Sequence, residues 1–288
     1  MTGDPVPPLG RLTGADVRVV QVDDYFSCPL FDAYERAVER RIGETEWDLA
    51  GIRRTVEDGD RVLEVGCGPG RVVLDLLRTY GSCEVTGIDL STVAVARAAG
   101  RVSEIGEAKR ADFVVADMTR WDPAGRFDVA VVADCSLNAF ATEASLDTLL
   151  DCLASTLVPD GRMALSIFDD GAAAELAGLD GRFTVDTFTT DDGIGYACWW
   201  AMAFDPTERM LKRSVFVQTS VGAPSEGVLC TMVDRIWSPS EILPMASRRG
   251  FEVHDRVPGS VDGGSAQGAR TVTLVLQRTG SRPPSTDG

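Results

Sequence analysis

The sequence predicts an α/β fold in which a mostly parallel sheet of seven strands has helices on both faces. Short apolar runs rich in β-branched residues alternate with stretches of helical periodicity from residue 61 to residue 168. Continuous apolar strands separated by helices are typical of a parallel sheet covered on both sides. The first run ends in a cluster of glycines. From about residue 169 to residue 237 the apolar period changes to two, which predicts an antiparallel β segment inserted into the parallel fold.

The elements of the parallel sheet follow in chain order. Two helices are predicted within residues 29–57, ahead of the first strand. Ser91 can cap the helix that follows the second strand. The first five strands are predicted at 61–65, 84–88, 113–116, 127–133 and 163–167. The helices between them are predicted at 70–79, 92–105 and 143–157.

The inserted segment and the end of the chain complete the predicted fold. Antiparallel strands are predicted at 195–204, 210–219 and 228–236, with a turn at 205–208. Trp199 and Trp200 are adjacent on one strand and therefore face opposite ways. A helix near 240–247 and strands at 251–257 and 271–276 return the chain to the main sheet. Residues 1–15 and 279–288 are rich in Pro, Gly, Ser and Thr and are predicted to be disordered tails.

Composition and charge exclude several classes of function. The formal net charge is −16, which argues against nucleic acid or an anionic membrane as a partner. No apolar run is long enough to span a bilayer, and the N-terminus has no secretory signal, so we expect a cytoplasmic protein. The seven cysteines are scattered without a CxxC pair and His254 is the single histidine, so we expect no metal site. The basic residues are nearly all arginine, which hints at a high-GC bacterial genome.

The glycine cluster lies where the first strand turns into a helix. It reads Glu64-Val65-Gly66-Cys67-Gly68-Pro69-Gly70, and glycines there allow backbone angles that other residues disfavour and a close approach of a ligand. The spacing is GxGxG rather than the GxGxxG of nicotinamide sites, and the acidic Glu64 suits a ligand poor in phosphate. Asp89 ends the second strand, 19 residues after Gly70. A carboxylate at that place can accept both hydroxyls of a ribose.

Five segments in this order resemble class I S-adenosylmethionine-dependent methyltransferases over roughly residues 60–278. The first two are VLEVGCGPGRV (62–72) and VTGIDLS (85–91), which resemble the first and second motifs of that family. The others are ADFVVADM (111–118), FDVAVVADCSLNAF (127–140) and SPSEILPMASRRGFEV (238–253). The resemblance implies a Rossmann-like fold, S-adenosylmethionine as cofactor with S-adenosylhomocysteine as product, and no metal.

The resemblance also implies roles for individual residues. Gly66, Gly68 and Gly70 pass close to the methionine and ribose parts of the cofactor, and Glu64 steadies the loop or meets the methionine amino group. Asp89 holds the ribose hydroxyls, Asp117 and Met118 bracket the adenine, and Asp134 begins the loop that faces the sulfonium. The implied cofactor-binding residues are Tyr25, Glu64, Gly66, Cys67, Gly68, Gly70, Asp89, Leu90, Asp117, Met118 and Asp134. For Asp117 and Asp134 the alternative is an ordinary carboxylate in a turn at a strand end.

Catalysis in such a site needs alignment more than a strong base, because the cofactor already carries an activated methyl group. If a base is used, Asp134, Ser136 and Asn138 are the candidates after the fourth strand, with Tyr25 as a further one. His254 is expected at a sheet edge away from the methyl donor. Tyr25 would close over the cofactor or be a core aromatic. Trp199 and Trp200 would each pack in a core, or one would line the substrate pocket.

These arguments predict an N-terminal tail with lid helices (1–58), a Rossmann-like core (59–168 and 238–278), a substrate cap (169–237) and a disordered tail (279–288). The predicted function is methyl transfer to an N, O or C atom of a small molecule in secondary metabolism, by a monomer or homodimer. One alternative is a relative that binds the same cofactor but catalyses cyclisation, decarboxylation or hydroxylation. Others are an inactive regulatory subunit and, disfavoured by the glycine spacing, a nicotinamide-dependent dehydrogenase.

Overall fold

The computed structural model describes residues 4–12, 17–42, 47–123, 125–190, 193–219, 227–260 and 268–279. The chain forms two compact units, each of which has its own sheet. The main unit consists of Glu46–Asp170, Trp237–Gly259 and Thr271–Gly288. The second unit consists of Met1–Thr45, Gly171–Ile236 and Ser260–Arg270.

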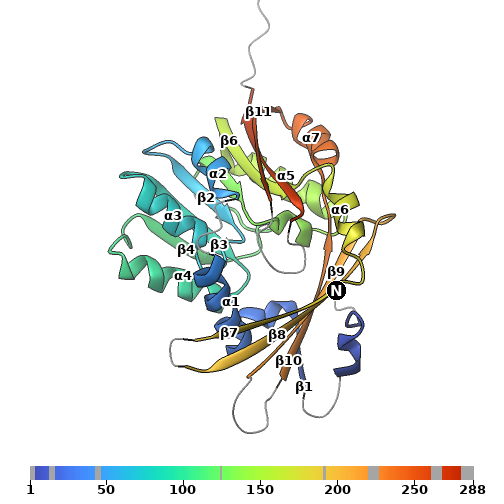
Figure 1. Ribbon diagram of the computed structural model, residues 1–288. Coiled ribbons are helices and arrows are strands. Elements are labelled where there is room, and N and C mark those ends of the chain that lie inside the picture. Colours follow the sequence, from blue (N-terminus) through green and yellow to red (C-terminus); the bar gives the residue numbers. More distant parts are fainter. Residues whose placement is uncertain are drawn as a thin grey trace, which may run out of the picture. The chain divides into compact units, whose positions relative to one another are not determined.

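The main unit contains a seven-stranded sheet in the order β11-β12-β6-β5-β2-β3-β4 (Figure 1). Strands β4, β3, β2, β5 and β6 pair in parallel, and β12 runs antiparallel to β6. The strands are β2 (Arg61–Val65), β3 (Glu84–Asp89), β4 (Ala111–Val115), β5 (Phe127–Val132), β6 (Leu157–Phe168), β11 (Phe251–Ser260) and β12 (Arg270–Arg278). All seven predicted strands of the main sheet are therefore present, and the predicted fold class is confirmed.

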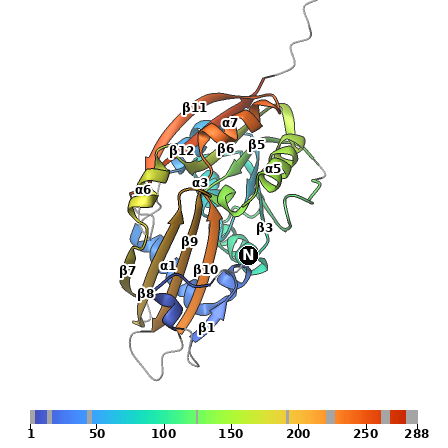
Figure 2. The same ribbon diagram turned by 90° about the vertical axis from the view of Figure 1, so that its right-hand side faces the viewer.

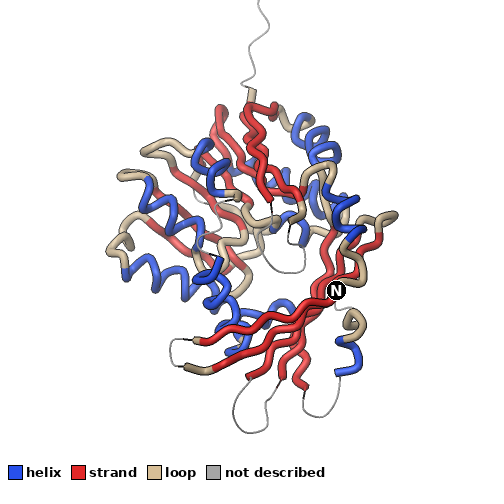
Figure 3. Tube along the Cα trace, viewed as in Figure 1, coloured by secondary structure: helices blue, strands red, loops and turns tan. Residues whose placement is uncertain are grey.

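Helices cover both faces of this sheet because side chains along each strand alternate between two apolar clusters. On β2, for example, Leu63 belongs to the cluster under α5 and α7, and Val62 belongs to the cluster under α2, α3 and α4. The helices are α2 (Leu49–Thr55), α3 (Arg71–Thr79), α4 (Thr92–Glu104), α5 (Glu143–Thr156) and α7 (Pro239–Ser247). Ser91 caps α4 as predicted, with its hydroxyl accepting the Ala94 N–H at 3.2 Å. The alternation of strand and helix is visible in Figure 3.

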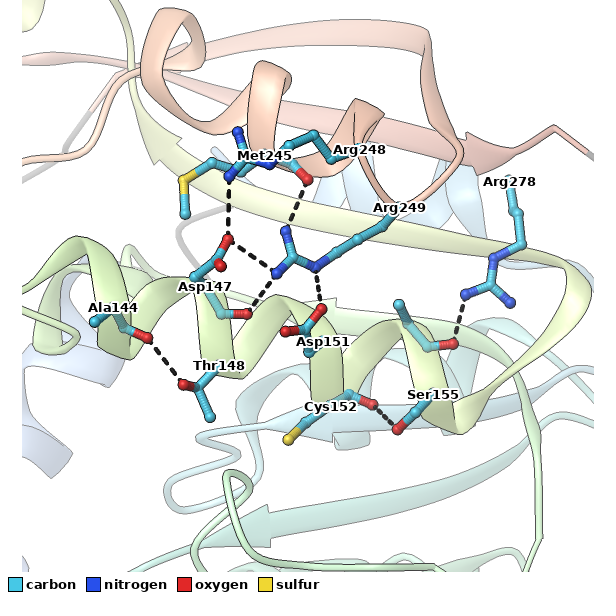
Figure 4. Close-up of polar contacts among 11 residues, drawn as sticks. Ala144, Asp147, Thr148, Asp151, Cys152, Ser155, Met245, Arg248, Arg249 and Arg278 are labelled. Atoms are coloured by element: carbon cyan, nitrogen blue, oxygen red, sulfur yellow. Dashed lines mark hydrogen bonds and ion pairs between the residues drawn. The ribbon is translucent and has the colours of Figure 1, made fainter.

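Two arginines after α7 contact α5, and Arg249 makes most of these bonds (Figure 4). The Arg249 guanidinium donates to a carboxylate oxygen of Asp151 at 2.7 Å and to the Asp147 carbonyl at 2.9 Å. It also donates to the Met245 carbonyl at 2.9 Å. The Arg249 side chain is only 10% exposed, whereas neighbouring Arg248 is 56% exposed and pairs with Asp147 at 3.2 Å. Arg249 therefore fixes the end of α7 on α5 and sets the start of β11.

The second unit contains a five-stranded sheet in the order β1-β10-β9-β8-β7 (Figure 2). Its pairs are antiparallel except for β1 and β10, which are parallel. The strands are β1 (Val17–Val20), β7 (Phe183–Thr189), β8 (Gly195–Asp205), β9 (Met210–Thr219) and β10 (Gly227–Arg235). The helices are α1 (Pro29–Ile42), α6 (Ala172–Gly178) and the 3₁₀ segments η1 (Leu9–Leu12) and η2 (Val22–Ser27). The predicted antiparallel segment is thus present, with β1 and β7 in addition.

Apolar clusters cover both faces of this second sheet. On one face, residues of η2 and α1, including Phe31 and Tyr34, pack against β8, β9 and β10. On the other face, Val6 and Leu9 are buried against Phe216 and its neighbours. The prediction that residues 1–15 form a disordered tail is therefore wrong for residues 4–12, because two apolar side chains among the prolines and glycines reach the sheet. Residues 280–288 lie outside the described part of the chain.

The unit boundaries differ in part from those expected. The segment 1–58 does not stay together, because α1 belongs to the second unit and α2 to the main unit. The antiparallel region was expected at 169–237 and its unit includes Gly171–Ile236, joined by N-terminal residues and by Ser260–Arg270. Among the described helices, none is both long and apolar enough to cross a membrane.

Candidate functional site

Three glycines shape the turn from β2 into α3 in the main unit. Gly66, Gly68 and Gly70 have φ angles of 71°, 50° and 85°, in the left-handed region that favours glycine. A Cβ on Gly70 would lie 2.9 Å from the Ala98 Cβ, so this glycine also allows α3 and α4 to pack closely. The Gly66 N–H donates to the Ile88 carbonyl at 2.8 Å, which holds the turn against the end of β3. The predicted glycine loop is present with the predicted conformations.

Asp89 lies at the end of β3, next to this turn. One carboxylate oxygen accepts the Gly68 N–H at 2.9 Å and the other accepts the Ser91 N–H at 2.8 Å. Each carboxylate oxygen can accept a second hydrogen bond, and the Asp89 side chain is partly exposed. The following residue, Leu90, is 69% exposed. Asp89 is therefore held by the loop while keeping acceptor capacity for a ligand with two neighbouring hydroxyls.

Glu64 is a buried carboxyl on β2 beneath the glycine turn. The residue is 2% exposed, and one of its oxygens, Oε2, has no hydrogen-bond partner. Burial raises the pKa of Glu64 to about 8. A buried acceptor without a donor is costly, and a ligand that carries an ammonium group would satisfy it. Cys67, on the same turn, is buried, and burial raises its thiol pKa well above its usual range.

An ion pair that the sequence analysis did not identify lies beside Glu64. Asp48, the residue before α2, is fully buried and accepts two bonds from the Arg71 guanidinium, at 2.8 and 2.6 Å. Arg71 is the first residue of α3, directly after Gly70. Asp48 also accepts the Asp134 N–H at 3.0 Å. The pair thus joins the starts of two helices to the loop after β5.

The loop after β5 adopts an unusual backbone conformation. Asp134 and Cys135 have φ angles of 49° and 56°, so two successive non-glycine residues are left-handed, which costs on the order of 1 kcal/mol each. The Asp134 side chain is exposed. The Ser136 hydroxyl lies 3.4 Å from where a Cβ on Gly66 would be, so this loop packs against the glycine turn. Asp134 and Ser136 are therefore at the carboxyl edge of the sheet, beside the predicted cofactor loop.

The remaining predicted residues of the main unit have other surroundings. Asn138 is buried, and its side-chain oxygen accepts the Trp237 N–H at 3.4 Å. Met118 is 4% exposed within the apolar core and offers little surface to a purine. Asp117 accepts two bonds from Thr119, at 2.9 and 2.7 Å, and these bonds lower its pKa. Asp117 thus accepts hydrogen bonds within a turn, as its alternative assignment expects, and its contact with adenine stays a prediction.

Tyr25, Trp199 and Trp200 all pack inside the second unit. The Tyr25 ring stacks on Phe31 with centroids 4.5 Å apart, and its hydroxyl donates to Glu35 at 2.5 Å. The Trp200 indole N–H donates to the Tyr34 hydroxyl at 3.1 Å. Trp199 faces the opposite side of the sheet, as predicted, with its ring 5.3 Å from that of Phe216. These contacts are those of core aromatics, with Trp200 against Tyr34 of α1 and Trp199 against Phe216 of β9.

His254 lies on β11, at the edge of the main sheet, and is exposed. It lines a cavity of about 520 Å³ together with Asp128, Asp160 and Arg162. These residues lie at the amino-terminal ends of β5 and β6, whereas the glycine turn lies at the carboxyl end of β2. The cavity therefore lies at the amino-terminal ends of the parallel strands, and the glycine turn lies at their carboxyl-terminal ends. The expectation that His254 lies away from the cofactor loop agrees with the structure.

The residues around the glycine turn fit S-adenosylmethionine. The methionine part of that molecule carries an ammonium group, which the unpartnered oxygen of Glu64 can accept, and the ribose carries two hydroxyls, which Asp89 can accept. The three left-handed glycines let a ligand approach the main chain. Within the described residues, no group of three or more His, Cys, Asp or Glu side chains is arranged to hold a metal ion.

Comparisons with known proteins show a similarity to methyltransferases. Residues 62–161 match a family model described as "Methyltransferase domain". The ribosomal protein L11 methyltransferase of Burkholderia thailandensis is 35% identical over 153 residues, which are 53% of this chain and 45% of that protein. The chain thus matches less than half the length of that curated relative.

Solved structures share the fold over nearly their whole length. A S-adenosylmethionine-dependent methyltransferase from Clostridium acetobutylicum superposes with a TM-score of 0.68 at 14% identity, covering 87% of this chain and 99% of that one. CalS10, an amino pentose methyltransferase from Micromonospora echinaspora involved in calicheamicin biosynthesis, superposes with a TM-score of 0.67 at 19% identity. That match covers 88% of this chain and 98% of CalS10.

Proposed function

We propose that this chain, of which residues 62–161 match a methyltransferase domain, is a class I methyltransferase that transfers a methyl group from S-adenosylmethionine to a small molecule. The observation that carries the proposal is the combination at the carboxyl ends of β2 and β3. Three glycines hold left-handed conformations there, with the acceptor Asp89 and the unpartnered carboxyl of Glu64 beside them. This set of groups is suited to a ligand with a vicinal diol and an ammonium group.

The chain's own residues have three tasks in this reaction. Bound S-adenosylmethionine supplies an activated methyl group, so the protein has to bind it, orient the acceptor atom and keep water out. Glu64, the glycine turn and Asp89 perform the binding. The loop that begins at Asp134 borders the turn, with Ser136 in contact with Gly66. A proton released by the acceptor would pass to Asp134, to Ser136 or to water.

For the acceptor we propose an amine on a natural-product molecule. CalS10, described as an amino pentose methyltransferase, has the same fold. Four carboxyl groups, those of Asp48, Glu64, Asp89 and Asp134, lie around the glycine turn together with the guanidinium groups of Arg71 and Arg101. This surplus of carboxyl groups over the two arginines favours a cationic cofactor and a basic acceptor. A cytoplasmic monomer or homodimer that does not bind nucleic acid is part of this proposal and rests on the sequence.

The experiment is a turnover assay with methyl-labelled S-adenosylmethionine and a panel of amino sugars, hydroxylated sugars and phenols. We expect S-adenosylhomocysteine to accumulate with label in the product, most rapidly with an amine, and we expect Asp89→Asn to lose this activity. Label transfer only to oxygen or carbon would overturn the choice of acceptor. Cofactor binding without turnover of any acceptor would favour a regulatory subunit, and product formation without label transfer would favour cyclisation, decarboxylation or hydroxylation.

A further inference from the structure

Asp48 and Arg71 connect three segments that are far apart in the sequence. The bidentate pair joins the start of α2 to the start of α3, with nitrogen–oxygen distances of 2.8 and 2.6 Å. The Asp48 oxygen that accepts the 2.6 Å bond also accepts the Asp134 N–H at 3.0 Å. Asp48 is fully buried and the Arg71 side chain is 21% exposed, so water competes little for these bonds.

The turn that donates this N–H has an uncommon backbone conformation. Asp134 and Cys135 both have left-handed backbone conformations. Backbone hydrogen bonds between residues three positions apart close the turn around them. The Ser136 N–H donates to the Ala133 carbonyl, and the Asn138 N–H donates to the Cys135 carbonyl, each at 2.9 Å. A charged group from another part of the main unit also contacts this turn, because the Asp134 N–H donates to the Asp48 carboxylate. Such a conformation persists where surrounding contacts determine it.

We propose that Asp48 and Arg71 are positioning residues that hold the turn of residues 134–136 in its left-handed conformation against the glycine turn. Arg71 fixes the orientation of the Asp48 carboxylate by its two parallel bonds, and Asp48 in turn fixes the Asp134 backbone. The catalytic value of this arrangement rests on the proposed function, in which Asp134 and Ser136 border the cofactor. The effect on the conformation of the turn does not depend on it.

A second ion pair between the same two helices offers a comparison for the Asp48–Arg71 pair. Arg53 and Asp75 also join α2 to α3, through two hydrogen bonds, of which the one from Arg53 Nε is 2.9 Å long. Asp75 is 6% exposed. This pair links the same two helices through Asp75, which lies four residues after Arg71 on α3. Asp75→Asn is therefore a matched control for Asp48→Asn.

Cys135 provides the readout, because its thiol lies in the turn and is partly exposed. Of the other cysteines only Cys152 is partly exposed, and the remaining five are buried. In a Cys152→Ser background, the initial rate of reaction with a thiol reagent reports the opening of the turn. We expect Asp48→Asn to raise this rate by about tenfold and Asp75→Asn to change it by less than about twofold, because only the first loosens the turn.

Two further measurements keep the proposal testable if Asp48→Asn does not fold. Arg71→Lys retains the charge but loses the fork geometry, and we expect its labelling rate to lie between those of the parent and Asp48→Asn. In the unmodified protein, hydrogen exchange of the Asp134 amide should be slowed at least about tenfold relative to an open turn. Equal labelling in the Asp48 and Asp75 variants, or an unprotected Asp134 amide, would overturn the proposal. None of these readouts needs cofactor, so a failure to bind S-adenosylhomocysteine would instead count against the proposed function.

Discussion

Replacing Glu64 by glutamine should change how stability depends on pH. Burial raises the pKa of Glu64 to about 8 in the folded protein from its ordinary value of 4.5. Between pH 4.5 and about pH 8, the Glu64 carboxyl therefore keeps a proton in the folded state that it has released in the unfolded state. The contribution to stability is fully present below about pH 4.5 and is lost as the pH rises through 8. The loss amounts to about 1.4 kcal/mol for each pH unit within this window.

Glutamine has the same shape as the protonated carboxyl and does not titrate, so the comparison isolates this group. The free energy of unfolding of Glu64→Gln, minus that of the parent, should rise by about 3 to 4 kcal/mol between pH 5 and pH 8. Urea unfolding at constant ionic strength and without cofactor measures this difference, and other titrating groups cancel in the subtraction. A difference that stays constant with pH would refute the reasoning, because Glu64 would then be ionised in the folded protein.

Four other substitutions test the assignment of residues outside the glycine turn. His254→Ala should keep kcat within about threefold of the parent, since general-base catalysis contributes about 10²–10⁴-fold and a loss of that size would place β11 near the reacting atoms. Trp200→Ala should lower the free energy of unfolding by about 3–5 kcal/mol through loss of core packing and of the bond to Tyr34; a higher KM with unchanged stability would return Trp200 to the substrate pocket. Arg249→Ala should lower the free energy of unfolding in urea by about 2 kcal/mol. Arg248 is more exposed, so Arg248→Ala should lower it by only about 0.5 kcal/mol. Equal losses would mean that the Arg249 contacts in Figure 4 contribute little.

The main sheet could be predicted because its signals are local. Each parallel strand is a short apolar run, and Gly66, Gly68 and Gly70 mark the turn where three left-handed residues are required. The acceptor Asp89 follows from its place at the end of the next strand. Strand ends and glycine conformations are encoded within a few residues, so the cofactor loop could be located without a structure.

The second unit was less predictable because its pairings are distant. Strand β1 is four residues long and pairs with β10, more than 200 residues later. Strand β7 lies at a sheet edge with alternating exposed side chains, including Phe183 and Val185, so it lacks a buried apolar face. Val6 and Leu9 stand among prolines and glycines, and composition alone gives no sign that they are buried.

The Asp48–Arg71 pair shows the same limit within the site. Asp48 precedes a short helix, Arg71 follows the glycines, and Asp134 lies two residues after the end of β5, so no spacing rule links the three. Their contact depends on how α2, α3 and β5 pack. Conversely, Asn138 had a suitable position in the sequence, yet its side chain is engaged with the backbone of Trp237. Position at a strand end predicts where a residue lies, and the side-chain partners come only from the fold.

The most direct test of the cofactor site is a calorimetric titration with S-adenosylhomocysteine of the parent protein and two matched variants. Asp89 and Asp128 are both carboxylates that accept a backbone N–H, Asp89 at the glycine turn and Asp128 from Arg61 at the opposite end of the sheet. We predict one binding site per chain, a dissociation constant at least about 30-fold higher for Asp89→Asn, equivalent to about 2 kcal/mol, and an unchanged constant for Asp128→Asn. No binding by the parent, or equal affinity in all three proteins, would contradict the account.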